Sequence, residues 1–341
     1  MTERKSREIR LKKRPEGMPQ PGDFELAETA VAAPKAGEIL VRNIYMSVDP
    51  YMRGRMVDRK SYVPPFQIGE TLAGGAVGQV VESQNPKFQP GDYVSNFNGW
   101  REWFASDGAG MEKIDPNLAP LSSYLGTFGM PGLTAYAGLL RVGALKEGER
   151  VFVSAASGAV GSIVCQIAKN KGCYVVGSAG SDDKCDWLKK EARVDAAINY
   201  KTCGDLTEAV AKAMPEGIDV YFENVGGAHL EAALANMRNF GRIPVCGMIG
   251  EYNAEAAEPG PNNLINIVLK SLTLKGFIVS QHTDMMGAFI SDMSGWAREG
   301  KLKWHETVVE GIEKAPEAFI GLFKGANFGK MLVRLGPDKA G

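Results

Sequence analysis

One segment decides the fold of this chain, and it reads Val151-Phe152-Val153-Ser154-Ala155-Ala156-Ser157-Gly158-Ala159-Val160-Gly161-Ser162-Ile163-Val164. A short apolar run is followed by small residues, and apolar residues then recur at helical spacing. This order predicts a buried strand, a tight turn and a helix whose unpaired first N–H groups and positive dipole end favour an anion. The segment therefore predicts a phosphate-binding turn formed by Gly158, Ala159, Val160 and Gly161.

The glycines of this turn match a dinucleotide-binding pattern in part. The pattern is G-x-G-x-x-G, and Ala156 stands at the position of its first glycine. Gly158 lets a pyrophosphate approach the main chain, and Gly161 lets the helix pack closely on the strand. The alternative is a strand–helix turn of small residues that binds no ligand.

The residues after the second expected strand indicate which dinucleotide would bind. An NAD site places a carboxylate there, whereas this chain has Ser181 and, three residues later, Lys184. A 2′-phosphate carries about −1.5 to −2 charges and would be attracted by both side chains. The sequence therefore predicts NADP rather than NAD. The alternative for Lys184 is a solvated lysine in a helix capped by Ser181, and Asp182 and Asp183, expected to favour the helix dipole, could also reach a ribose.

Composition describes a globular chain of ordinary polarity. The chain has 341 residues, of which 44% are hydrophobic and 23% charged, and a formal net charge of −1. This length predicts two domains, and the balanced charge argues against a nucleic-acid surface. No apolar run is long enough to cross a membrane, and we expect no secretion signal after Met1. Five scattered cysteines without a C-x-x-C pair fit a reducing cytoplasm and predict neither disulfides nor a bound metal.

Basic residues cluster at one point, between Arg4 and Arg14. Ile9 and Leu11 lie within this cluster, which favours a frayed arm that leads into an edge strand. The alternative is a basic arm that binds a partner.

Two kinds of pattern divide the chain. Up to about residue 125, short β-like runs alternate with Gly/Pro turns, which predicts a small β-barrel-like domain. From about residue 130, strands alternate with helices, which predicts one doubly wound parallel sheet. The strands expected in this sheet cover residues 151–153, 174–178, 196–198, 218–222, 242–246 and 272–279. A last strand at 330–335 could complete the first domain, which would then be discontinuous.

In a doubly wound sheet, ligands bind beyond the carboxyl ends of the strands. Asn224 follows the fourth expected strand, and Tyr252 follows the fifth on a loop that glycines make adaptable. Residues 280–283 follow the sixth. Each loop could instead be a turn whose polar residues cap helices, but together with the phosphate-binding turn they predict a common cofactor crevice.

Longer motifs carry a family resemblance over nearly the whole chain. They comprise Ser47-Val48-Asp49-Pro50-Tyr51-Met52-Arg53-Gly54-Arg55-Met56, residues 126–136, 155–161, 223–227 and 246–253, and Asn327-Phe328-Gly329-Lys330. With these motifs the chain resembles the zinc-independent medium-chain dehydrogenase/reductases, in particular the NADPH-dependent alkenal/one reductases. Zinc-bearing relatives carry Gly-His-Glu near Gly69-Glu70, and the histidine is missing here.

The resemblance implies an α/β protein with a GroES-like catalytic domain at residues 1–128 and 310–341 and a Rossmann domain at 129–309. It also implies a cytoplasmic homodimer that reduces the activated C=C bond of a small enone or alkenal with NADPH (NADP). No metal, nucleic acid or membrane is expected as a partner.

The resemblance further implies the residues that contact the cofactor. Lys184 and Tyr200 are expected at the 2′-phosphate, in addition to Ser181. The other expected contacts are Asn224, Cys246, Gly247, Met248, Ile249, Gly250, Glu251, Tyr252, Phe277, Ile278, Val279, Asn327, Phe328 and Gly329.

The expected reaction delivers a hydride to the β-carbon, after which the substrate oxygen carries enolate charge and needs a hydrogen-bond donor. We expect Tyr252 to be this donor. Tyr51, Arg53 and Met130 are expected at the substrate, although Arg53 could instead form an ion pair that bridges the domains. The alternative functions are an NADPH-dependent quinone reductase and a non-catalytic NADPH-binding sensor protein.

Overall fold

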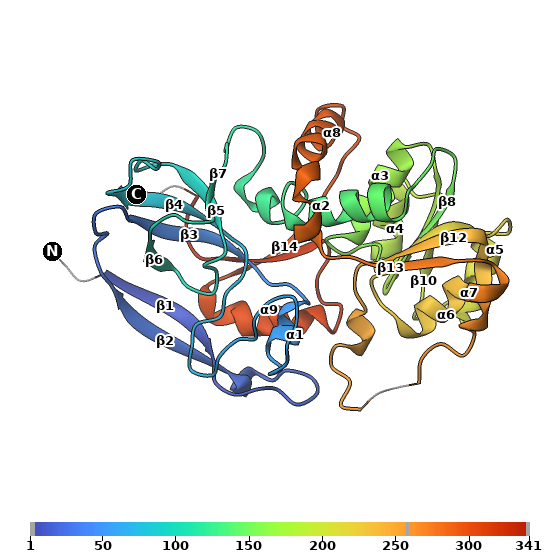
Figure 1. The fold of residues 1–341 in the computed structure, drawn as a ribbon, viewed down its shortest axis with the longest axis horizontal. Helices are drawn as coiled ribbons and strands as arrows, with labels where there is room; N and C mark the ends of the chain where they lie inside the picture. The colour runs from blue at the N-terminus through green and yellow to red at the C-terminus, as the bar shows by residue number, and fades with distance from the viewer. Residues whose placement is uncertain (1–3, 257–258, 339–341) are drawn as a thin grey trace. The chain divides into compact units, whose positions relative to one another are not determined.

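The computed structural model describes residues 4–256 and 259–338, which divide into two compact units (Figure 1). The first unit contains the described residues up to Leu125 and from Glu306 onward, and the second contains those between. The sequence analysis placed residues 306–309 in the second domain. In the structure, β14 (Glu306–Glu310) pairs in parallel with β15 (Lys330–Arg334), so this segment belongs to the sheet of the first unit.

The second unit is built on a parallel sheet that, in the described residues, has six strands in the order β10-β9-β8-β11-β12-β13. Neighbouring strands all pair in parallel, which confirms the predicted doubly wound sheet. The order reverses between β8 and β11, the position at which such sheets bind ligands. The strands are β8 (Arg150–Val153), β9 (Tyr174–Ala179), β10 (Ala196–Asn199), β11 (Ile218–Phe222), β12 (Met237–Val245) and β13 (Thr273–Gly276).

Helices cover both faces of this sheet (Figure 1). The helices α3 and α4 lead from β8 to β9 and from β9 to β10, whereas α5, α6 and α7 lead from β10 to β11 and onward to β13. The two groups therefore run across the sheet in opposite directions, and right-handed crossovers place them on opposite faces. The predicted apolar spacing of α3 is confirmed, because Ile163, Val164 and Ile167 are all buried. The helical elements are α2 (Met130–Ala137), η3 (Gly138–Val142), α3 (Gly161–Asn170), α4 (Asp182–Lys190), α5 (Leu206–Ala213), α6 (Gly227–Asn236), η4 (Ile249–Glu251), α7 (Ile265–Leu269), η5 (Val279–Met285) and α8 (Met286–Arg298).

The first unit holds a mixed sheet in the order β14-β15-β3-β4-β5-β7, with β6 paired to β3, and a separate antiparallel pair of β1 and β2. Its core includes Trp100 with Phe24 and Phe319, whose ring centroids lie 6.2–6.3 Å apart. The remaining elements are β1 (Arg4–Leu11), η1 (Pro21–Asp23), β2 (Phe24–Val31), β3 (Ile39–Ser47), α1 (Met52–Arg55), β4 (Ala76–Ser83), β5 (Tyr93–Asn96), β6 (Trp103–Ser106), β7 (Glu112–Lys113), η2 (Leu121–Leu125), η6 (Ile312–Lys314) and α9 (Ala315–Leu322).

The basic segment forms the expected edge strand from Arg4 onward, and a frayed arm before it would lie outside the described residues. β1 pairs with β2 along its whole length, from Arg4 opposite Val31 to Leu11 opposite Phe24. Carboxylates of the same unit neutralise its charges, in the ion pairs Arg4–Glu82, Lys5–Glu28, Arg7–Glu102, Arg10–Glu8 and Lys13–Asp23. The alternative of a basic arm that binds a partner therefore loses its physical basis.

Candidate active site

The turn after β8 has the geometry of a phosphate-binding turn. The N–H of Gly158 donates to the Ala155 carbonyl, whereas the N–H groups of Ala159 and Val160 form no hydrogen bond within the described residues. Both groups lie half-exposed directly before α3, where the helix dipole is positive. Gly161 has to be glycine, because a Cβ there would lie 2.4 Å from the Ala155 oxygen. The turn can therefore offer two N–H donors to an anion.

Ala156 replaces the first glycine of the usual pattern without disturbing the turn. Its methyl group is fully buried and faces Gly177 of the neighbouring strand β9. A Cβ at Gly177 would lie only 2.7 Å from the Ala156 Cβ. The absence of a side chain at position 177 thus provides the space that Ala156 requires.

Tyr200 and Lys184 lie near the end of β9. The Tyr200 N–H donates to the Ala179 carbonyl at 3.1 Å, and its hydroxyl oxygen would lie 2.8 Å from a Cβ at Gly180. The Cε of Lys201 would lie 3.2 Å from the same Cβ. Burial lowers the pKa of Lys184, and the charge of Lys201 lowers it further. We call Gly180, Lys184, Tyr200 and Lys201 the phosphate-end cluster; the sequence analysis missed Lys201, because an exposed lysine after a strand carries no signal of its own.

In the part of the chain that the structure describes, Ser181 does not cap a helix and Asp182 binds a protein side chain, so neither takes the alternative role considered for it from the sequence. Ser181 precedes α4, but its side chain caps no N–H of that helix within the described residues. The Asp182 carboxylate accepts a hydrogen bond from Asn199 Nδ2 at 2.7 Å, which ties α4 to the end of β10. Because the Asp182 carboxylate accepts this bond from a protein amide, we no longer expect Asp182 to bind a ribose.

A buried histidine packs against the ring of Tyr200. His229, on α6, is 5% exposed, and its ring centroid lies 5.0 Å from that of Tyr200 in an edge-on arrangement. Burial lowers the pKa of His229 to about 4, and its Nε2 has no hydrogen-bond partner within the described residues. At neutral pH this imidazole is uncharged and acts as a packing surface for Tyr200.

A buried carboxyl group joins the ends of β8 and β11. Glu223 is fully buried, and its Oε1 accepts hydrogen bonds from Tyr221 Oη at 2.8 Å and Ser154 Oγ at 3.1 Å. The same oxygen accepts the N–H groups of Val225 at 2.6 Å and Gly226 at 3.0 Å. One oxygen atom therefore fixes the backbone of the loop after β11. The sequence analysis assigned no role to Glu223.

Burial also acts on the acidity of this carboxyl group. Burial raises the pKa of Glu223, and the hydrogen bonds from Gly226 and Val225 lower it by less. Its Oε2 is buried without a hydrogen-bond partner in the described ranges. Burial also raises the pKa of Tyr221. Hydrogen bonds to one buried carboxyl group, rather than an ion pair, thus shape the loop.

Two loops at this edge of the sheet are joined into one body. The first comprises residues 223–227 after β11, and the second comprises residues 246–252 after β12; we call them the Glu223 loop pair. Backbone hydrogen bonds connect them at Cys246 N–Glu223 O (2.9 Å), Ile249 N–Asn224 O (3.1 Å) and Gly250 N–Val225 O (3.0 Å). The network around Glu223 therefore also sets the position of the second loop.

The Tyr252 hydroxyl is held over this loop. The Met248 N–H donates to Tyr252 Oη at 3.3 Å, and a Cβ at Gly247 would lie 2.7 Å from the same oxygen. The Tyr252 N–H donates to the Ile249 carbonyl at 3.4 Å. Glycine at position 247 is therefore needed for the phenol to lie across the main chain.

The Asn224 side chain ties two loops together, and the Cys246 thiol is protonated. Asn224 Nδ2 donates to the Ser154 carbonyl at 2.8 Å, and the Asn224 N–H donates to Ser154 Oγ at 2.9 Å. Burial raises the pKa of Cys246 to about 12, so its thiol stays protonated. Burial likewise raises the pKa values of Cys165, Cys173 and Cys185.

The strand expected at 272–279 ends earlier, because β13 stops at Gly276. The Phe277 side chain is buried, 6.3 Å from the ring of Phe222, and it fills the space beside Gly138. Any contact of Phe277 with a cofactor would therefore use its main chain. Ile278 and Val279 are half-exposed, and Val279 begins η5.

In the first unit, Arg53 packs against the main chain of a neighbouring segment. Its guanidinium donates to the Gly17 carbonyl at 3.0 Å, the residue is 5% exposed, and burial lowers its pKa. A contact of Arg53 with substrate stays a prediction. Tyr51 directly precedes α1 and is half-buried, and burial together with the charge of Asp49 raises its pKa.

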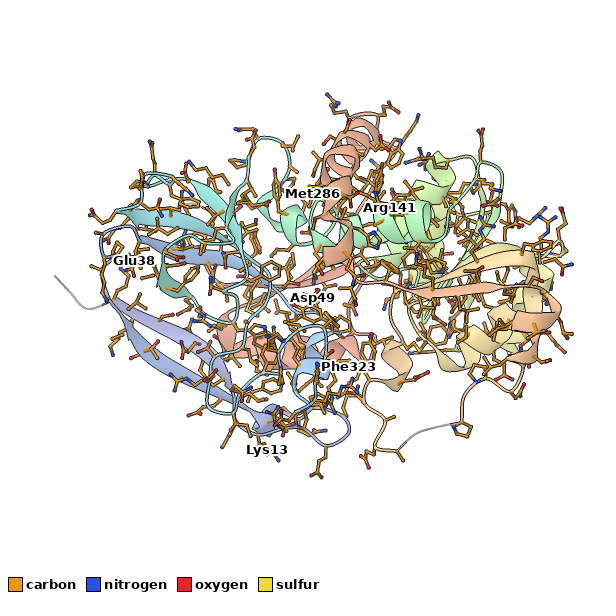
Figure 2. The ribbon with its side chains drawn as sticks, viewed as in Figure 1. Lys13, Glu38, Asp49, Arg141, Met286 and Phe323 are labelled. Atoms are coloured by element: carbon orange, nitrogen blue, oxygen red, sulfur yellow. The ribbon has the colours of Figure 1, made fainter. Side chains whose placement is uncertain are left out.

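A buried ion pair joins two of the family motifs within the first unit. Lys330 Nζ lies 3.1 Å from Asp49 Oδ1 and donates to the Val48 carbonyl at 3.0 Å. Both side chains are nearly inaccessible; Asp49 is labelled in Figure 2. Just before Lys330, Asn327 Nδ2 donates to the Gly329 carbonyl at 2.8 Å, and the Phe328 N–H donates to Thr307 Oγ1 at 2.8 Å.

Met130 begins α2 in the second unit and is half-exposed, with its carbonyl accepting from Thr134 Oγ1 at 2.7 Å. In the described ranges, His, Cys, Asp and Glu side chains form no group of three that could hold a metal ion. No helix in the same ranges is long and apolar enough to span a bilayer.

Comparison with known proteins identifies relatives along both units. Residues 7–114 match the family model described as the N-terminal domain of oxidoreductase, and residues 159–294 match the model described as zinc-binding dehydrogenase. The chain is 44% identical over 333 residues to the NADPH-dependent curcumin reductase of Escherichia coli (strain K12), with 96% of each chain covered. It is 44% identical over 335 residues to the NADP(+)-dependent 2-alkenal reductase of Nicotiana tabacum, with coverage of 96% and 97%.

A solved structure, CurA of Vibrio vulnificus in complex with NADPH, matches with a TM-score of 0.93 and 42% identity over 97% of this chain and 99% of the other. These matches confirm a GroES-like first unit and a Rossmann second unit. The chain belongs to the medium-chain dehydrogenase/reductase family of NADP-dependent oxidoreductases, among relatives that include curcumin, 2-alkenal and prostaglandin reductases.

Proposed function

We propose that this protein reduces the activated C=C bond of α,β-unsaturated ketones and aldehydes with NADPH. The observation that carries the proposal is the Tyr252 hydroxyl, which Met248 N–H holds over Gly247 at the carboxyl edge of the Rossmann sheet. Relatives named NADPH-dependent curcumin reductase and 2-alkenal reductase support this class of substrate.

The residues of the second unit fit NADPH. The N–H groups of Ala159 and Val160 would bind the pyrophosphate, and Lys184, Tyr200 and Ser181 would bind the 2′-phosphate. The Glu223 loop pair, residues 277–279 and, from the first unit, residues 327–329 complete the proposed contacts.

The proposed mechanism assigns one main task to the protein. NADPH, when bound, would supply a hydride to the β-carbon of the substrate, and a proton from a tyrosine or from water would complete the saturated product at the α-carbon. Negative charge then develops on the substrate carbonyl oxygen, and the Tyr252 O–H donates a hydrogen bond to that oxygen. Because Met248 N–H donates to the same phenol oxygen, the hydroxyl is both positioned and polarised. Tyr51 and Met130 are the proposed substrate contacts.

The deciding experiment follows NADPH absorbance with enones, alkenals, diarylheptanoids and quinones, with the saturated product of each alkene as control. We expect turnover of the conjugated alkenes and recovery of the saturated carbonyl compound. Turnover of quinones alone would replace the proposal with quinone reduction. NADPH binding without turnover of any substrate would replace it with a sensor role.

We also propose a cytoplasmic homodimer. β13 is an edge strand, and beside it α7 and its preceding residue expose Leu264 (47%), Ile265 (60%), Val268 (72%) and Leu269 (69%). An exposed edge strand next to an apolar patch fits a second copy whose own β13 extends the sheet. The cysteines are free thiols, as a reducing compartment favours. Sedimentation should show a dimer, and Val268→Asp should yield monomers; a wild-type monomer would exclude the assembly.

A further inference from the structure

The phosphate-end cluster contains a cation to which no role has yet been given. Lys201 follows Tyr200 directly, and its N–H donates to Asn199 Oδ1 at 3.1 Å, which fixes the start of this loop to the end of β10. The Lys201 Cε and the Tyr200 Oη both approach the position that a side chain at Gly180 would occupy, at 3.2 and 2.8 Å. The aliphatic stem of Lys201 therefore crosses the end of β9 beside the Tyr200 hydroxyl.

Charge at this position is unbalanced. Lys201 forms no ion pair with any carboxylate of the described residues. The nearby Asp182 carboxylate is held by Asn199 Nδ2 at 2.7 Å. Lys201 lies close enough to Lys184 for its charge to lower the pKa of that lysine. Two ammonium groups that repel each other beside a phenol hydroxyl are typical of a site that binds a dianion.

Gly180 explains why both side chains can gather there. Any Cβ at this position would meet Tyr200 Oη at 2.8 Å, so a larger residue would displace the hydroxyl and the lysine stem together. On the other side of Tyr200, the buried ring of His229 limits the movement of the phenol. The cluster thus combines a hydroxyl of limited mobility with the Lys201 stem beside it and with a second cation, Lys184, within range of the Lys201 charge.

We propose that Lys201 is a further ligand of the cofactor's 2′-phosphate, beside Lys184 and Tyr200, and that it contributes to the preference for NADPH over NADH. This inference rests on the proposed function, in which NADPH binds along this edge of the sheet. A charge-assisted bond from an exposed lysine is expected to change affinity by about tenfold.

The test measures dissociation constants for NADPH and NADH by cofactor fluorescence with the full-length protein, at low and at high salt. The variants are Lys201→Ala, Lys201→Arg and, as a matched control, Lys212→Ala, which removes an exposed lysine from the last turn of α5 at the opposite edge of the sheet. Lys201→Ala should weaken NADPH binding by about tenfold, leave NADH binding as in the wild type and reduce the salt dependence of NADPH binding. Lys201→Arg should retain most of the affinity.

A second probe isolates this end of the site. Adenosine 2′,5′-bisphosphate should compete less well for Lys201→Ala than for the wild type, whereas adenosine 5′-monophosphate should compete equally. If Lys201→Ala and Lys212→Ala bind NADPH equally well, the role of Lys201 is wrong while the proposed function stands. If the wild type binds NADH as tightly as NADPH, the NADPH specificity of the proposed function fails as well.

Discussion

At the ends of β9 and β10 the protein presents lysines to solvent, whereas at the ends of β11 and β12 it buries a carboxyl group under two loops. Lys201 is exposed and lies beside the hydroxyl of Tyr200, and the half-buried Lys184 is close enough to feel its charge. In the Glu223 loop pair, one buried oxygen accepts both side-chain and backbone donors. The same edge of the sheet therefore exposes cations at the ends of β9 and β10, and it buries a hydrogen-bonded carboxyl group at the ends of β11 and β12.

This difference follows from what each end has to do. A dianionic phosphate is recognised by cations, and exposed lysines supply them without the cost of burying charge. A loop that has to hold a hydroxyl within hydrogen-bond distance of a reacting atom needs a fixed backbone, which buried hydrogen bonds provide. Substitutions at the phosphate-end cluster should therefore change affinity, and substitutions in the Glu223 loop pair should change turnover or stability.

The largest effect is expected for Tyr252→Phe. This variant should bind NADPH nearly as the wild type does and lose roughly tenfold to a thousandfold in turnover, because the donor to the enolate oxygen is removed. Single-turnover rates with an enone would measure the loss. Tyr174→Phe is the control. Tyr174 begins β9 at the opposite edge of the sheet, and its hydroxyl donates to the Ala213 carbonyl. Equal turnover of Tyr252→Phe and the wild type would refute the donor role.

Glu223→Ala is the next largest change. It removes the acceptor for Tyr221 Oη and the N–H groups of Val225 and Gly226, and leaving such buried donors unsatisfied should cost about 3 kcal/mol or more. Urea unfolding would measure the free energy. Glu223→Gln keeps an acceptor oxygen for these donors, so we expect it to be closer to the wild type than Glu223→Ala. A Gln variant as unstable as the Ala variant would show that the group is needed as a carboxylate.

Lys184→Ala should act at the other end of the sheet edge and leave stability unchanged. Loss of one charge-assisted hydrogen bond is expected to lower the preference for NADPH over NADH by roughly tenfold to a hundredfold. The ratio of kcat/KM values for the two cofactors measures this preference, with Lys212→Ala as the control. An unchanged ratio would remove Lys184 from the phosphate site.

The smallest expected effect concerns His229 and pH. Its pKa is lowered to about 4 in the folded protein from the ordinary 6.5, so the unfolded chain binds the proton more readily between these values. The stability contributed by the neutral ring is full above pH 7 and is lost as pH falls from about 6.5 to about 4. Between pH 7 and pH 5 the wild type should lose about 2 kcal/mol more than His229→Phe, which keeps a ring against Tyr200. Urea unfolding at both pH values measures this, and equal losses would contradict a buried neutral imidazole.

Local pattern was sufficient to predict the framework of the second unit. The strand–turn–helix at 151–164 and the strands of the parallel sheet were predicted from apolar spacing, because each depends on residues close in sequence. The segment 306–309 was assigned to the wrong unit, because its partner strand β15 lies about twenty residues later and no local signal selects it.

Residues of the candidate site could be predicted from the sequence only where they belong to a recognisable motif. Lys184 has a sequence signal in its distance from the glycine turn, and Tyr200 came from the family resemblance alone. Lys201, His229 and Glu223 were not found, because their roles arise from contacts between segments that pattern does not bring together. The sequence does contain one signal for Glu223. It directly follows a buried strand, in the run Glu-Asn-Val-Gly-Gly, and a carboxyl group at such a position needs hydrogen-bond donors from within the protein.

The burial of the cysteines has a chemical consequence. Conjugated enones and alkenals alkylate thiolates by Michael addition, and the thiolate rather than the thiol is the nucleophile. Because burial raises the pKa values of Cys165, Cys173, Cys185 and Cys246, these sulfur atoms remain protonated at neutral pH. These four sulfur atoms are thereby poor targets for the electrophiles proposed as substrates, whereas Cys203 is half-buried in the structure.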